Sequence, residues 1–153
     1  MGLRQKGYIS MLLRIRYLCY SAIVASLICG LPMTTQATDG ISLELNTAIQ
    51  HDSNCRLHFL LSNNTTHTFS DFRIEIAFFD NSGRFVNHAT ADFLKVGAHK
   101  TVMRSFDVPG QQCVHLGKIL LNDDAVCISE NGAIHECVEL IEPTHRTEIL
   151  FFK

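Results

Sequence analysis

The chain has 153 residues, of which 46% are hydrophobic and 18% charged, which favours one small domain whose core contains no Trp. Charge is divided along it: four Lys and Arg and no acid precede residue 38, whereas 9 Lys and Arg against 15 Asp and Glu give the remainder a formal charge of −6. An acidic body without a basic cluster argues against nucleic acid and anionic membrane surfaces as partners.

Residues 1–37 have the pattern of a secretory signal. A basic stretch precedes an uncharged, mostly apolar run over 17–31, and the sequence TQA at 35–37 supplies small residues for cleavage. We predict cleavage after Ala37. Met11 is an alternative first residue of the translated chain. The alternative is an uncleaved membrane anchor, but the 15-residue apolar run is shorter than the roughly 20 residues that cross a bilayer. No membrane span is expected after cleavage.

The mature chain, 38–153, begins with strand patterns of period two. Ile41–Ile49 places Ile41, Leu43, Leu45, Thr47 and Ile49 on one face of a half-buried strand. Cys55–Leu61 alternates in the same way and puts Cys55 on the core-facing row. Asp71–Asp80 has the strongest alternation, with Phe72, Ile74, Ile76 and Phe78 on one face.

The turn Asp80-Asn81-Ser82-Gly83 predicts a hairpin that continues over 84–93. Further strands are predicted at 101–108, 116–122 and 147–152. Between the last two, Ile134, Cys137, Val138 and Ile141 have helical spacing, which predicts a short helical segment ended by Pro143. The pattern predicts an all-β fold: one immunoglobulin-like β-sandwich of about seven strands, with one short helical segment near the C-terminus.

Four cysteines remain after Cys19 and Cys29 leave with the signal. An even number in a small exported domain indicates two disulfides among three possible connectivities. We favour Cys55–Cys113, which joins distant strands, and Cys127–Cys137, which closes a short loop.

Metal binding is the alternative use of these residues. Cys113 and His115 with His135 and Cys137 would supply a tetrahedral zinc set, and Asp123 and Asp124 form the best acidic cluster for calcium. Neither half of the zinc set has the usual ligand spacing, and oxidation competes for the thiols. We therefore predict no metal site and no cofactor.

The sequence lacks the common catalytic motifs. It contains no Gly-x-Ser-x-Gly, no His-Glu-x-x-His, no Gly-rich phosphate loop and no Cys-x-x-Cys, so we predict that the protein is not an enzyme.

Several stretches carry a resemblance to known proteins. Phe72–Asp80 followed by Gly83 looks like the centre of small extracytoplasmic Ig-like modules of bacteria. The mature chain also resembles a family of uncharacterised small exported proteins of Gram-negative bacteria, often labelled "Tat pathway signal sequence domain" proteins. The matching stretches are ISLELN at 41–46, Cys55-Arg56, Phe79-Asp80-x-x-Gly83, Gly97-x-x-Lys100-Thr101, Phe106-Asp107, LGKILLND at 116–123, Cys127, Cys137 and THRTE at 144–148.

This resemblance implies a periplasmic protein and transfers no catalytic residue. One departure concerns the route: Arg14 and Arg16 are separated by Ile15, so the twin arginines of a Tat signal are missing and Sec export is expected. The sequence therefore predicts a periplasmic, non-enzymatic module that binds an unknown protein or envelope component. The alternative is a periplasmic metal-binding protein that uses Cys and His or the acidic cluster.

Overall fold

The computed structural model describes residues 39–153, so the predicted signal, residues 1–37, lies outside the described part. Over this range the chain forms nine β-strands and two 3-10 helices, η1 and η2, and no α-helix. The strands are β1 Ile41–His51, β2 Asn54–Asn63, β3 Phe69–Asp80, β4 Phe85–Asp92, β5 Lys100–Val108, β6 Leu116–Ser129, β7 Gly132–Ala133, β8 Ile141–His145 and β9 Leu150–Phe152. Helix η1 is Cys113–His115 and η2 is Cys137–Leu140.

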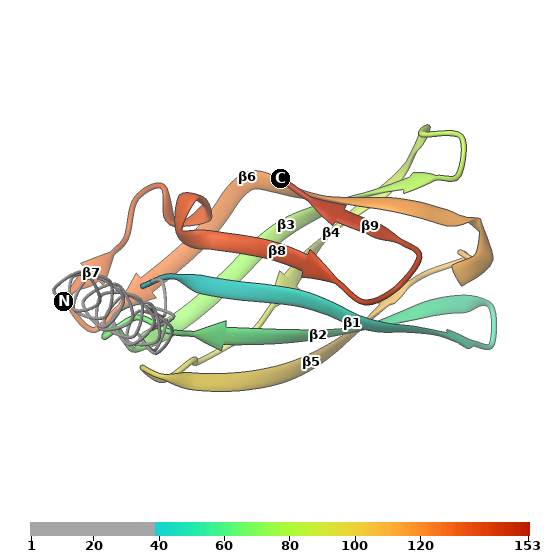
Figure 1. Ribbon diagram of the computed structural model, residues 1–153. Helices are drawn as coiled ribbons and strands as arrows, with labels where there is room; N and C mark the ends of the chain where they lie inside the picture. The colour runs from blue at the N-terminus through green and yellow to red at the C-terminus, as the bar shows by residue number, and fades with distance from the viewer. Residues whose placement is uncertain (1–38) are drawn as a thin grey trace, which may run out of the picture. The chain divides into compact units, whose positions relative to one another are not determined.

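The strands form two sheets that pack as a sandwich (Figure 1). Sheet A has the order β5-β2-β1-β8 and sheet B the order β4-β3-β6-β7, with β9 also paired to β6. Neighbours are antiparallel except β1 with β8 and β6 with β9, which are parallel. The predicted all-β sandwich is confirmed, with nine strands in place of about seven.

The core lies between the sheets and is built from the rows that the sequence predicted most clearly. In β2, Leu57, Phe59 and Leu61 are buried, and in β3 the alternate residues from Phe72 to Phe78 are buried. Aromatic rings connect the layers: Phe59 of sheet A meets Phe151 of sheet B edge to face, with ring centroids 5.4 Å apart. The two sheets therefore share one continuous hydrophobic core.

Strand β1 departs from its predicted alternation in its second half. Ile41, Leu43 and Leu45 are buried as predicted, but the register with β2 shifts between Leu45 and Thr47. This bulge rotates the strand, so Thr47 is exposed and Ile49 is 54% exposed. The prediction of a core-facing Ile49 was wrong because a period-two pattern contains no signal for the extra residue.

The C-terminal half contains the elements that the sequence missed. Strand β6 runs on to Ser129, past the predicted end at residue 122. The predicted helical segment is the 3-10 helix η2, and the chain then forms β8 through Pro143. A parallel edge strand tolerates this Pro because a strand edge leaves N–H groups unpaired.

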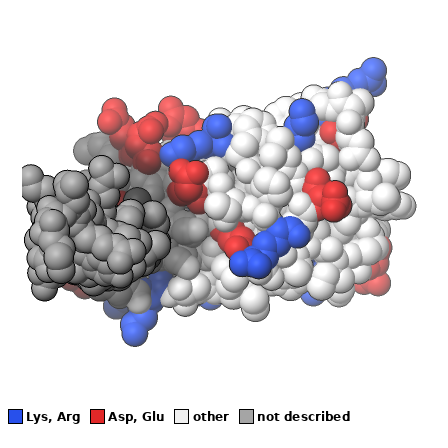
Figure 2. All heavy atoms as spheres, in the orientation of Figure 1, with Lys and Arg blue, Asp and Glu red and all other residues white. Residues whose placement is uncertain are grey.

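Surface charge on the face shown in Figure 2 is sparse. Lys and Arg side chains are scattered there, most of the surface is uncharged, and acidic side chains gather near the end that carries η2. Within the described part, no helix has the length and apolar character that a bilayer crossing requires.

Candidate binding surface

The four cysteines of the described residues form two disulfides. Cys55 at the start of β2 pairs with Cys113 in η1, and Cys127 of β6 pairs with Cys137 in η2. This is the connectivity favoured from the sequence. Disulfides of this kind persist in oxidising compartments, so the pairs are consistent with export.

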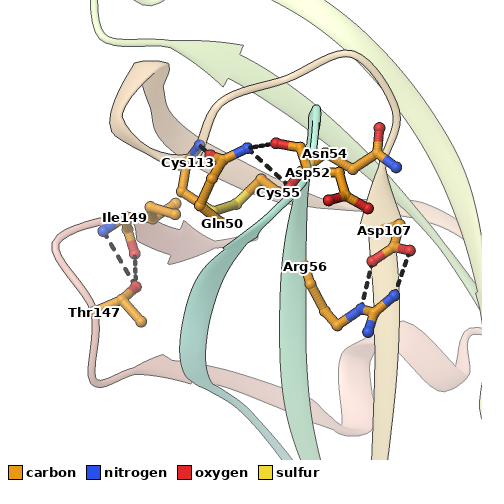
Figure 3. The surroundings of a disulfide bond; sticks show 9 residues. All are labelled: Gln50, Asp52, Asn54, Cys55, Arg56, Asp107, Cys113, Thr147 and Ile149. Carbon is orange, nitrogen blue, oxygen red and sulfur yellow. Dashed lines mark hydrogen bonds and ion pairs between the residues drawn. A yellow bond between two sulfur atoms is a disulfide. The ribbon is translucent and has the colours of Figure 1, made fainter.

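The Cys55–Cys113 disulfide fastens the segment between β5 and β6 to the β1–β2 turn (Figure 3). Gln50 Oε1 accepts a hydrogen bond from the backbone N–H of Cys113 at 3.0 Å, and Asn54 Oδ1 accepts one from Gly110 N–H at 3.0 Å. Gln50 Nε2 also donates to the carbonyl oxygens of Asp52 and Asn54. Two loops far apart in sequence are thus held by one covalent and several polar contacts.

The β3–β4 turn joins the same end of the sandwich. Asn81 Nδ2 donates to the Val114 carbonyl at 2.8 Å, which ties the turn to η1. Gly117 permits the close approach, since a Cβ there would lie 2.9 Å from Asn81 Cα and from the Asp80 carbonyl oxygen. We call the β1–β2 turn (52–53), the segment 109–115 and the β3–β4 turn (81–84) the loop end.

Asp80 fixes the conformation of the β3–β4 turn. Its Oδ1 accepts from Ser82 Oγ at 2.6 Å, Ser82 N–H at 2.8 Å and Arg84 N–H at 2.9 Å. The Ser82 hydroxyl and the Arg84 amide hold the pKa of this carboxyl below its usual value. The turn predicted from Asp80 to Gly83 is present, with Gly83 at φ +81°.

The loop end exposes apolar side chains beside a hollow. Val114 is 71% exposed and Phe85, just after the turn, is 60% exposed and packs on Phe79 with ring centroids 6.1 Å apart. Next to them lies a shallow hollow of about 510 Å³, lined by Asp80, Asn81, Ser82, Val86, Gln111 and His115. A surface this rigid loses little entropy when it binds a partner.

The metal candidates do not come together. His115 lies in η1, Asp123 and Asp124 in β6, and His135 between β7 and η2. The two cysteines of the zinc set belong to different disulfides, so neither offers a thiolate. Among residues 39–153, no three His, Cys, Asp or Glu side chains gather as metal ligands.

The acidic cluster lies in an irregular part of strand β6, which continues past the predicted strand end at residue 122. Pairing between β3 and β6 shifts between Ile74 and Ile76, so residues 122–124 bulge opposite Glu75. Asn122 Nδ2 donates to Glu75 Oε1 at 2.9 Å, which anchors the bulge to β3. These polar residues therefore form a bulge within a long strand.

Cross-strand polar pairs on the outer face of sheet A were not foreseen. Ser105 Oγ lies 2.7 Å from His58 Nδ1, and Arg56 donates to both carboxylate oxygens of Asp107 at 2.7 and 2.9 Å. The Arg56 hydrogen bond lowers the pKa of Asp107. These partners are 47 and 51 residues apart, so only the β2–β5 register reveals them.

These features define a class: an all-β sandwich with two disulfides and a rigid loop end. No family model matches the chain, and no curated protein matches it. A solved structure that is similar is that of IrmA from Escherichia coli. The TM-score is 0.57 at 15% sequence identity, and the match covers 68% of this chain and 90% of that one. At this identity the similarity concerns the fold alone.

Proposed function

We propose that this protein is an exported, non-enzymatic module that binds a protein component of the cell envelope through its loop end. The observation that carries the proposal is the rigid, disulfide-fastened surface that presents Val114 and Phe85 to solvent beside a hollow of about 510 Å³. Binding residues are often found on loops positioned by a stable scaffold.

The chemistry of the surface favours a protein partner. Val114 and Phe85 supply apolar contact area, and the turn and His115 supply polar groups around them. Burial of one such apolar side chain is worth about 1.5–3 kcal/mol. Because hydrogen bonds and the disulfide already order these loops, most of that free energy is available for binding.

The proposed location of the protein is the periplasm. The signal pattern of residues 1–37 and the two disulfides support export to the periplasm, with Sec translocation and cleavage after Ala37. The motifs shared with small exported proteins of Gram-negative bacteria, and the likeness to bacterial Ig-like modules, support the same assignment.

In-cell photo-cross-linking tests the binding surface. A photoreactive amino acid is placed at Val114 in one variant and at Met103 in a matched control, because Met103 is 57% exposed on β5, away from the loop end. We expect one discrete cross-linked protein from position 114, weakened by the added change Phe85→Asp, and none from position 103. Identical products from both positions, or none from either, would contradict the proposal.

A further inference from the structure

The four edges of the two sheets differ in how well they are protected against pairing. One side of sheet B ends in β7 and β9, which have two and three residues, and one side of sheet A ends in β8, which contains Pro143. The opposite edge of sheet A is β5, which carries Lys100 and Arg104, and the opposite edge of sheet B is β4. Strand β4 has eight residues and none of Lys, Arg, Glu or Pro. Charges, proline and short length discourage edge pairing, and of these β4 has only the charge of Asp92 at its end.

The backbone of β4 has pairing groups directed outward. The N–H of Phe93 donates to Phe72 O of β3, so by alternation the odd-numbered residues of β4 bond to β3. The N–H and C=O groups of His88, Thr90 and Asp92 therefore point away from β3. Among residues 39–153, β3 is the strand that pairs with β4.

We propose that β4 pairs antiparallel with β4 of a second copy of this chain, around a two-fold axis at Thr90. This register places Thr90 opposite Thr90 and His88 of each copy opposite Asp92 of the other. All three side chains are exposed, so the His–Asp pairs form twice on the outer face of the joined sheet. Thr–Thr pairs are favourable cross-strand neighbours, and an imidazole N–H can donate a hydrogen bond to a carboxylate opposite it.

The surroundings of β4 fit this register. The register shift against β3 lies between Phe78 and Phe79, so the segment 87–92 is regular. Its inward row is Ala89 and Ala91, which pack on the core and add no bulk at the edge. One change accompanies pairing: the N–H of His88, which donates to its neighbour Asn87 Oδ1 at 2.9 Å, turns to the second copy.

A carboxylate of the same chain already lies beside residue 88. His88 Nδ1 lies 3.6 Å from Glu75 Oε1 of β3, so Asp92 of the second copy adds a second carboxylate beside the same imidazole. A negative charge at residue 88 would repel both carboxylates. Because a few edge residues form the contact, the dimer is expected to be weak and concentration-dependent.

Sedimentation equilibrium of the purified protein tests the pairing. Wild type is expected to dimerise reversibly as its concentration rises. His88→Glu is expected to raise the dimer dissociation constant about tenfold, since two carboxylates then face each other in each of the two pairs, and His88→Lys should preserve the dimer. Met103→Glu adds the same charge to the other long edge, β5, and should change nothing.

Short bis-maleimide cross-linking locates the axis. Thr90→Cys should give a covalent dimer, whereas Met103→Cys on β5 should stay monomeric. A wild-type protein that is monomeric up to about 1 mM would overturn the proposal. So would a dimer that His88→Glu leaves unchanged, or one that cross-links through residue 103.

Discussion

Replacing Cys55 and Cys113 together by Ala opens the larger of the two covalent loops without changing the charge of the chain. These cysteines are 58 residues apart, whereas Cys127 and Cys137 are 10 apart. In the chain-entropy model, the longer cross-link stabilises the fold by about 4 kcal/mol and the shorter one by about 3 kcal/mol. The pair Cys55→Ala and Cys113→Ala is therefore expected to lower the free energy of unfolding more than the pair Cys127→Ala and Cys137→Ala.

Urea unfolding followed by far-UV circular dichroism measures both losses. Residues 38–153 contain neither Trp nor Tyr, so the backbone signal replaces intrinsic fluorescence. Opening the long loop should also increase the m-value, because the unfolded chain then exposes more surface. If the short-loop variant lost as much stability as the long-loop variant, or more, the entropic reasoning would be refuted.

Three further predictions concern the core, the loop end and pH. Phe59→Ala should cost about 3–5 kcal/mol of unfolding free energy, whereas Phe85→Ala, at a largely exposed site, should cost less than about 1; urea midpoints compare them. Gly117→Ala should cost about 1–3 kcal/mol because its Cβ meets the backbone of the β3–β4 turn, whereas the Cβ of Gly97→Ala meets the flexible side chain of Lys100; equal losses would contradict the close approach. Asp80 has a lowered pKa when folded, so its stabilising effect is present above its unfolded pKa and lost as pH falls through the folded value. The difference in urea midpoint between wild type and Asp80→Asn should stay constant above about pH 5 and shrink below about pH 4. A difference that stays flat down to about pH 2 would contradict the lowered pKa of Asp80.

Strands with one strongly buried face could be predicted from the sequence. Strand β2 from Cys55 to Asn63 and strand β3 from Phe72 to Phe78 bury every second residue, so the period-two pattern and the burial agree there. In β1 the pattern persists to Ile49, but the bulge after Leu45 breaks the correspondence. A bulge depends on how two strands pair, and a single strand carries no record of it.

The missed elements have related causes. Strand β6 continues through Asn122-Asp123-Asp124, although such polar residues are typical of loops. Glu75 of β3 anchors this part of the strand because it accepts a hydrogen bond from the Asn122 side-chain amide. Strand β8 forms at Pro143 because β1 offers a parallel edge beside it. Both outcomes depend on a neighbour distant in sequence, which overrides local preference.

The loop end was only partly predictable. The Asp80–Gly83 turn and the favoured Cys55–Cys113 pairing indicated two of its parts. The contact of Asn81 with Val114 and the exposure of Phe85 depend on the packing of three separate segments. Likewise, the edge position of β4 follows from the sheet order, which strand patterns do not specify.

We propose that residues 38–153 form an exported domain closed by two specific disulfides. Intact mass of the protein recovered from the periplasm, after alkylation without reductant, tests it most directly, followed by non-reducing peptide mapping. The expected result is the mass of residues 38–153 less four hydrogens, no alkylated thiol, and peptides joined as Cys55–Cys113 and Cys127–Cys137. A protein that keeps residues 1–37, or whose four cysteines are alkylated, would contradict it.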